Sequence, residues 1–182
     1  MRSDDLEEAT IYAEQMLRDP SWWPSPLADQ WRSLYPILFS AHDLEMAHNQ
    51  PRNHFFEWLA AVHLFQSERS LALVEKYQYR GAHPEKHALY TAAFTDDERR
   101  DLEAIQKEFG NKQLPDLLVL RQPDWRPYFV EVKGHDPITG HQDKLSAEQT
   151  ECFKAIRYQL EVRVVLLNVM LVDSGDLGTV PG

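Results

Sequence analysis

Two short apolar segments joined by a turn constrain the fold of this chain more than any other feature. Leu, Val and Phe dominate 117–120 and 129–132, and Gln122-Pro123-Asp124-Trp125-Arg126 lies between them. Branched and aromatic residues favour strands, and a short segment with Pro and Asp favours a turn. We therefore expect strands over Asp116–Arg121 and Pro127–Lys133, paired as a hairpin.

Three charged residues lie at one end of this hairpin. Side chains alternate between the faces of a strand, so Glu131 and Lys133 share a face, and Asp116 opens the neighbouring strand. Two carboxylates and an ammonium group suit phosphodiester hydrolysis. One or two carboxylates can hold Mg²⁺, which keeps several waters, and a lysine can orient the attacking water or stabilise charge.

Helical and strand patterns alternate along the rest of the chain and predict a mixed sheet flanked by helices, an α/β arrangement. The first 50 residues are expected to be a helical extension, with helices at 4–18 and 27–39 and a connector at 42–51. The other expected helices are 52–66, 84–94, one starting at Thr95 and ending before Gly110, and 146–160; the other expected strands are 71–79 and 163–170. We place the core domain at 51–172 and a short tail at 173–182.

Three sequence blocks in order resemble the VRR-NUC (virus-type replication–repair nuclease) domain of the PD-(D/E)XK nuclease superfamily. They are Gln113–Leu120, which contains Pro-Asp; Tyr128–Gly134, which contains Glu-Val-Lys-Gly; and Asp143–Gln149, which contains Leu-Ser-x-x-Gln. The resemblance covers about 114–167 and extends more weakly back to 52–79. It implies a restriction-endonuclease-like fold, a nucleic-acid substrate, Mg²⁺ or Mn²⁺, and catalytic Asp116, Glu131 and Lys133.

The resemblance also suggests further site residues. The carbonyl of Val132 is a possible metal ligand, and Gln149 would orient metal, water or backbone. The family tends to place a glutamate on its first helix near the metal; Glu57 is our candidate, with Glu75 on the following strand as the alternative. Glu57 is the only acid within 52–64, and a carboxylate on so apolar a helix needs a partner or a metal.

Several of these residues have a purely structural alternative. Ser146 and Gln149 have the spacing of a capping box, so Gln149 serves the start of a helix, the site, or both. Glu57 is equally compatible with a surface ion pair. His63 and Cys152 are expected to be core residues. The Trp22–Trp23 pair is expected to pack on the core, with partner binding as the alternative.

Charge and cysteine content bear on partners and location. The formal net charge is −10, which argues against a broad phosphate-binding surface. The excess of acidic residues is uneven along the chain: residues 1–57 contain 10 acids and 4 bases, whereas 112–163 contain 8 of each. A single cysteine, an acidic start and no apolar run of ~20 residues predict a cytoplasmic protein that does not enter a membrane.

Together these features predict a Mg²⁺-dependent deoxyribonuclease that acts in repair, recombination or defence, with branched or damaged DNA as a candidate substrate. Two alternatives are a non-catalytic nucleic-acid-binding domain that retains the fold, and a protein-interaction module that uses the Trp22–Trp23 region. A homodimer or a protein partner would help so acidic a nuclease to hold DNA.

Overall fold

The expected hairpin forms the centre of the fold. In a computed structural model of the protein, β3 (Leu117–Arg121) and β4 (Arg126–Asp136) pair antiparallel, with Leu117 opposite Val130 and Arg121 opposite Arg126. Most side chains from 117 to 136 are buried, as expected for central strands covered on both faces. The structure describes residues 6–51, 53–74, 77–78, 80–81, 83–110, 113–137 and 139–173.

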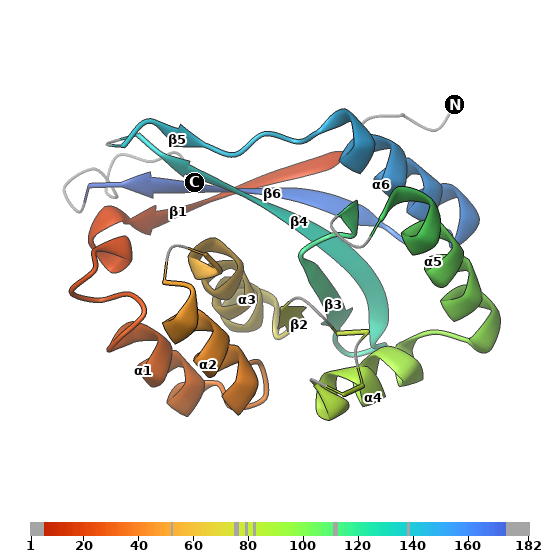
Figure 1. The fold of residues 1–182 in the computed structure, drawn as a ribbon, viewed down its shortest axis with the longest axis horizontal. Helices are drawn as coiled ribbons and strands as arrows, with labels where there is room; N and C mark the ends of the chain where they lie inside the picture. The colour runs from red at the N-terminus through yellow and green to blue at the C-terminus, as the bar shows by residue number, and fades with distance from the viewer. Residues whose placement is uncertain are drawn as a thin grey trace.

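One mixed sheet of six strands runs through the described residues (Figure 1). Its order is β1-β6-β4-β3-β2, and β5 pairs with the end of β4. The strands β1 and β4 both lie parallel to β6, whereas β2, β3 and β4 are successively antiparallel. The remaining strands are β1 (Glu7–Glu14), β2 (Leu71–Val74), β5 (His141–Gln142) and β6 (Val164–Val172).

Helices flank this sheet, which confirms the predicted α/β class. In Figure 1, α1 and α2 lie at the lower left, and α5 and α6 lie side by side at the right. The helical segments of the described chain are η1 (Gln15–Arg18), α1 (Leu27–Leu34), α2 (Ala41–Asn49), α3 (Phe55–Glu68), α4 (Pro84–Ala93), α5 (Asp96–Phe109) and α6 (Ala147–Gln159).

Neighbouring residues of β4 show that α3 and α6 cover opposite faces of the sheet. A Cβ added to Gly134 would lie 2.2 Å from the ring of Phe56, on α3. Glu131 accepts a hydrogen bond from Gln149, on α6. Since side chains alternate along a strand, the even positions of β4 face α3 and the odd positions face α6. The odd face carries the residues of the predicted site.

The predicted helix at 4–18 is wrong for most of its length. Residues 7–14 form β1, the edge strand beside β6, with Glu7 opposite Val165 and Glu14 opposite Val172. The sheet edge supplies the backbone hydrogen bonds that a helix would otherwise make, and such tertiary contacts override a weak local propensity. Ala13 is buried while Tyr12 is exposed, the alternation of a strand.

After β1, the N-terminal segment contains η1, α1 and α2. The structure corrects two further predictions. The expected connector at 42–51 is largely α2, which begins with a capping box between Ser40 and Asp43. The three-residue interval of such a box, from Ser40 to Asp43, is present in the sequence and indicates the start of this helix. His63 is exposed on α3 instead of lying in the core. The boundary at residue 50 stays a prediction, and the tail beyond Asp173 lies outside the described residues.

An aromatic cluster joins the N-terminal segment to α3. The Trp23 ring lies edge-on to Phe55 and Trp58, at centroid distances of 5.4 and 5.6 Å, and Phe39 stacks on Trp58. Trp23 is 3% exposed and Trp22 is 36% exposed, so core packing is confirmed for Trp23. Cys152 is fully buried, as expected. Among the described residues, no helix is both long and apolar enough to cross a membrane.

Candidate active site

Asp116 lies immediately before β3, and its carboxylate hydrogen-bonds to the backbone of β4 in place of a paired strand residue. The Val132 N–H donates a hydrogen bond of 2.9 Å to Asp116 Oδ2. The N–H and C=O groups of one strand residue point to the same edge. The carbonyl of Val132 therefore also points toward Asp116, at an edge of β4 that the five paired residues of β3 do not reach.

Glu131, Lys133 and Gln149 form a hydrogen-bonded triad on the odd face of β4. Lys133 Nζ lies 2.7 Å from Glu131 Oε1, and Gln149 Nε2 donates to the same oxygen at 2.6 Å. Gln149 Oε1 accepts from the Ser146 N–H at 3.1 Å and lies 3.4 Å from Lys133 Nζ. Gln149 therefore closes the capping box of α6 and also contacts Glu131 and Lys133.

The two carboxylates carry an electrostatic cost. Glu131 is 2% exposed, and its Oε2 has no hydrogen-bond partner among the described residues. Burial raises the pKa of Glu131, while Lys133 and Gln149 oppose the rise. Burial, followed by repulsion from Glu131 and Glu57, raises the pKa of Asp116 well above its usual value. A cation between these groups would relieve both effects.

Glu57 lies in the first turn of α3, half-buried, and it is close enough to act on the pKa of Asp116. Thus α3 directs a third carboxylate toward the site from the even face. The alternative residue, Glu75, lies outside the described residues. Among the described residues, no group of three or more His, Cys, Asp and Glu side chains is arranged to hold a metal ion.

The donor set nevertheless suits Mg²⁺. This ion needs only one or two carboxylates from the protein and completes its octahedron with water and substrate oxygens. Asp116 and Glu131 would supply the carboxylates, and Glu131 Oε2 is a buried acceptor with no hydrogen-bond partner among the described residues. All of these atoms are oxygens, which select a hard cation over zinc.

Several supporting contacts were not foreseen from the sequence. Tyr77 donates a hydrogen bond to the carbonyl of Pro115, the residue before Asp116, at 3.2 Å. Asp143 accepts from the Gly134 N–H at 3.1 Å and so continues the edge of β4 beyond Val132. Arg18 pairs with Asp136 at 3.1 Å. These contacts join distant segments, and no local pattern indicates them.

Gly134 lets α3 approach the strand that carries the site. With Gly134 replaced by Ala, we expect a loss of about 1–3 kcal/mol in unfolding free energy, because the new Cβ would overlap the Phe56 ring. Gly81→Ala is the control, since a Cβ there meets nothing within 4 Å. Urea denaturation measures both. Equal midpoints for the two variants would show that Phe56 moves aside without cost.

Residues 86–171 match the family model of the VRR-NUC domain. This part of the chain is a VRR-NUC domain. No curated protein and no solved structure matched the chain.

The VRR-NUC domain is a nuclease-family domain, so the match supports nuclease chemistry in general and nucleic acid as the substrate class. Its matched range contains β3, β4 and α6, and with them Asp116, Glu131, Lys133 and Gln149. The helix α3 and Glu57 precede the match. The predicted family is therefore confirmed.

Proposed function

We propose that this protein is a Mg²⁺-dependent nuclease that hydrolyses DNA phosphodiester bonds, with Asp116, Glu131 and Lys133 as its catalytic residues. The observation that carries the proposal is the convergence of these three side chains at the end of β3 and β4, with one oxygen of Glu131 buried and unpartnered.

The proposed metal ligands are Asp116, Glu131 and the carbonyl of Val132, with Glu57 as a further carboxylate. When bound, Mg²⁺ (or Mn²⁺) would acidify a water and neutralise charge on the phosphoryl oxygens. The Val132 N–H fixes the orientation of Asp116 before any ligand arrives, so little reorganisation is needed.

Lys133 has the position of a group that orients water or stabilises the scissile phosphate. Its ammonium is held by Glu131 and Gln149, and the side chain is 11% exposed. The side chain is thus largely enclosed, and its ammonium lies against the buried Glu131 carboxylate. Gln149 positions this ammonium and Glu131 together, and its own placement follows from the start of α6.

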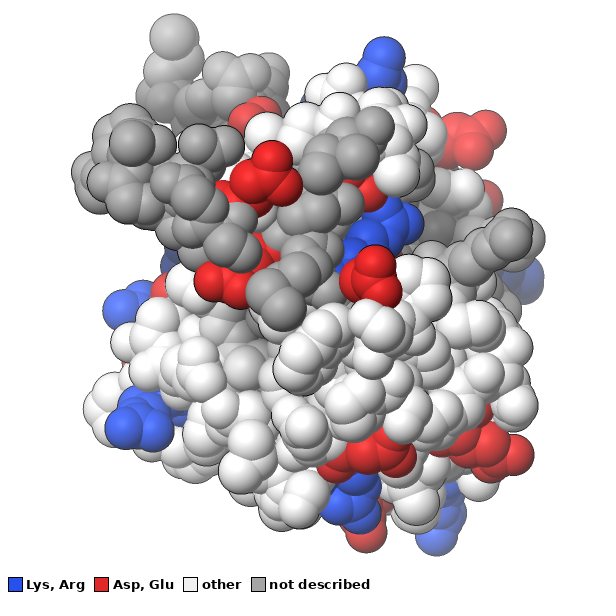
Figure 2. Space-filling view, turned by 90° about the vertical axis from the view of Figure 1, so that its left-hand side faces the viewer, with Lys and Arg blue, Asp and Glu red and all other residues white. Residues whose placement is uncertain are grey.

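Surface charge indicates how the protein would hold DNA. On the face shown in Figure 2, the described Lys and Arg residues stand as separate groups beside Asp and Glu, and form no continuous basic stripe. Phosphate contacts dominate nucleic-acid affinity, so binding would depend on the metal or on a protein partner or second copy that adds positive charge. The same charge pattern also fits the second candidate, a domain that retains the fold and does not cleave DNA.

Removing the ammonium of Lys133 separates these two functions. The wild type is expected to cut linear, flapped or four-way DNA with Mg²⁺ or Mn²⁺ and to be inactive in EDTA. The variant Lys133→Met keeps the stem and is expected to lose about 10²–10³-fold in cleavage rate, the usual effect of one lost charge-stabilising group. Gel-resolved single-turnover cleavage measures both.

Lys154→Met is the matched control, because Lys154 is also paired with a glutamate, Glu151 at 2.8 Å, but lies on the outer side of α6 and is half-buried. It should cut like the wild type. DNA binding without cutting by the wild type would establish the second candidate. If the wild type neither binds nor cuts DNA, the protein-interaction module remains as the candidate function.

A further inference from the structure

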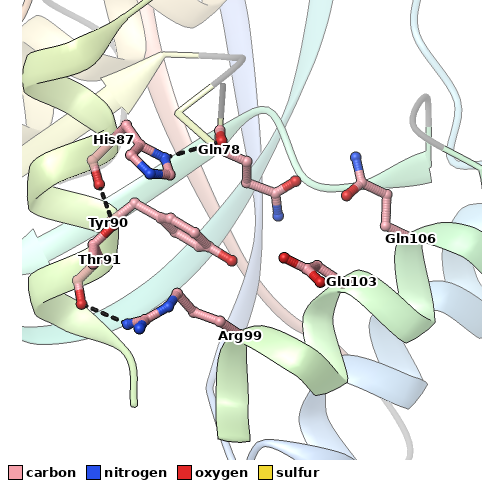
Figure 3. Close-up of a pocket in the computed structure, with 7 residues that line it drawn as sticks. All are labelled: Gln78, His87, Tyr90, Thr91, Arg99, Glu103 and Gln106. Carbon is pink, nitrogen blue, oxygen red and sulfur yellow. Dashed lines mark hydrogen bonds between the residues drawn. The ribbon is translucent and has the colours of Figure 1, made fainter. Parts of the chain in front are cut away.

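A polar cavity of about 530 Å³ lies between α4 and α5, outside the proposed active site. Its size falls in the range of about 300–1,000 Å³ that is typical of sites for small molecules and cofactors. It is lined by Gln78, His87, Tyr90, Thr91, Arg99, Glu103 and Gln106 (Figure 3).

Two side-chain amides give the cavity a capacity for directed hydrogen bonds. Figure 3 shows Gln78 and Gln106 approaching it from opposite sides, Gln78 from the segment after β2 and Gln106 from α5. Gln78 Nε2 is buried and has no hydrogen-bond partner among the described residues. A buried amide nitrogen without a partner is costly, and an acceptor atom of a ligand would satisfy it.

The charges of the cavity do not suit a phosphate group. Arg99 is the only arginine or lysine among the residues that line it, and its guanidinium is already bound to the carbonyls of Thr91 and Phe94 and to the Asp96 carboxylate. Glu103 adds a carboxylate on the same side. The ligand that fits is neutral and carries both donors and acceptors.

Two rings, tilted by 39° to each other, line the cavity beside these polar groups. Tyr90 and His87 have centroids 6.0 Å apart, and Figure 3 shows the Tyr90 hydroxyl directed toward Glu103 and the amide of Gln78. Burial raises the pKa of Tyr90 to about 12, so its hydroxyl keeps its proton at neutral pH and can donate. Amides and aromatic rings together are the groups that recognise the edges and faces of nucleobases.

The cavity adjoins the proposed active site through Tyr77. The ring of Tyr77 lies 6.1 Å from that of Tyr90, and its hydroxyl bonds to Pro115, next to Asp116. Tyr77 also packs against Phe129 on β4, at 6.2 Å. Tyr77 thus links a residue that lines the cavity to the segment that carries Asp116.

We propose that this cavity receives the base of an unpaired nucleotide of the nucleic-acid strand whose backbone crosses the active site. The identification of the strand rests on the proposed function; the capacity to bind a base does not. The protein would therefore prefer DNA with an unpaired segment, since a base within a duplex has its edge and face covered and must be taken out of the stack first.

Binding of free deoxynucleosides tests the cavity without any cleavage. Saturation-transfer NMR in the absence of metal would compare each of the four deoxynucleosides with deoxyribose, which has no base. We expect transfer to base protons in the wild type and none to deoxyribose. The double variant Gln78→Ala/Gln106→Ala should bind at least about tenfold more weakly, the effect of losing one good amide contact. The control Gln30→Ala/Gln159→Ala, at exposed positions on α1 and α6, should bind like the wild type.

Two results would overturn the base pocket: no transfer from the wild type to any nucleoside, or equal transfer in the cavity variant and the wild type. Cleavage assays then separate the two proposals. If the wild type binds nucleosides but cuts no DNA, the nuclease proposal fails and the pocket stands. Suppose instead that the wild type cuts DNA. If the variant Gln78→Ala/Gln106→Ala then cuts normal and abasic overhangs equally well, and as fast as the wild type, the base-pocket proposal fails and the nuclease proposal stands.

Discussion

With Asp116 replaced by Asn, Mg²⁺-dependent DNA cleavage is expected to fall by roughly 10³-fold or more, since a metal ligand contributes several kcal/mol of transition-state stabilisation and each 1.36 kcal/mol is tenfold in rate. The amide oxygen of Asn can still accept the Val132 N–H that now bonds to Asp116. The fold of the site is thus kept while its charge is lost. Single-turnover rates over a range of Mg²⁺ concentrations measure the effect.

The same substitution is expected to stabilise the metal-free protein. The pKa of Asp116 is raised by burial and by Glu131 and Glu57, so the folded state binds the proton more tightly than the unfolded chain does. Stability from the protonated group is present below the unfolded pKa of about 3.9 and is lost as the pH rises toward the folded pKa. Above the unfolded pKa the raised pKa of Asp116 therefore lowers the stability of the metal-free protein, and Asn removes that cost.

Thermal unfolding in EDTA checks this: the melting temperature of Asp116→Asn should exceed that of the wild type by a margin that grows from pH 4 to pH 8. Added Mg²⁺ should raise the melting temperature of the wild type and not of the variant. Asp124→Asn, on the exposed turn after β3, is the control and should change neither quantity. A variant that cuts DNA, or that melts below the wild type at pH 8, would exclude Asp116 as the metal ligand proposed.

Lys86→Met is expected to lower the unfolding free energy by about 3–5 kcal/mol, because it breaks a buried ion pair and leaves one charge behind. Lys86 Nζ lies 2.7 Å from Asp43 Oδ1 and 2.7 Å from the carbonyl of Val74. Both side chains are buried, at 4% and 7% exposure. This pair joins α2 of the N-terminal segment to α4 and to the end of β2.

Lys154→Met serves as its control, since that ion pair with Glu151 is largely solvated and such pairs contribute about 0.2–1 kcal/mol. Urea denaturation of both variants gives the comparison. Similar losses for the two would mean that water reaches Asp43 once the ammonium is gone. That result would reduce the Asp43–Lys86 pair to a surface contact in energetic terms.

Much of the site followed from spacing alone. The interval of two between Glu131 and Lys133 places both on one face of any strand, and the capping-box interval from Ser146 to Gln149 fixes the start of a helix. Both features are local, so tertiary context had little room to change them. The turn at 122–126 likewise brought Asp116 to the correct end of the hairpin.

Two of the errors arose where distant contacts decided the structure. Residues 7–14 have helical composition but complete the sheet beside β6, and only the presence of that open edge favours the strand. The exposure of His63 could not be predicted from the sequence either. The helix α3 is apolar on most sides, and its sequence does not show which side the sheet covers.

The sequence by itself therefore determined the α/β class, the hairpin and the residues of the proposed active site, since each depends on intervals within a strand or a helical turn. Only the tertiary structure decided which groups surround that site. Tyr77, the Gln78 and Gln106 amides and the Asp43–Lys86 pair join segments whose separation along the chain carries no periodic signal. Their placement follows from the packing of helices on the two faces of one sheet, which is a property of the whole chain.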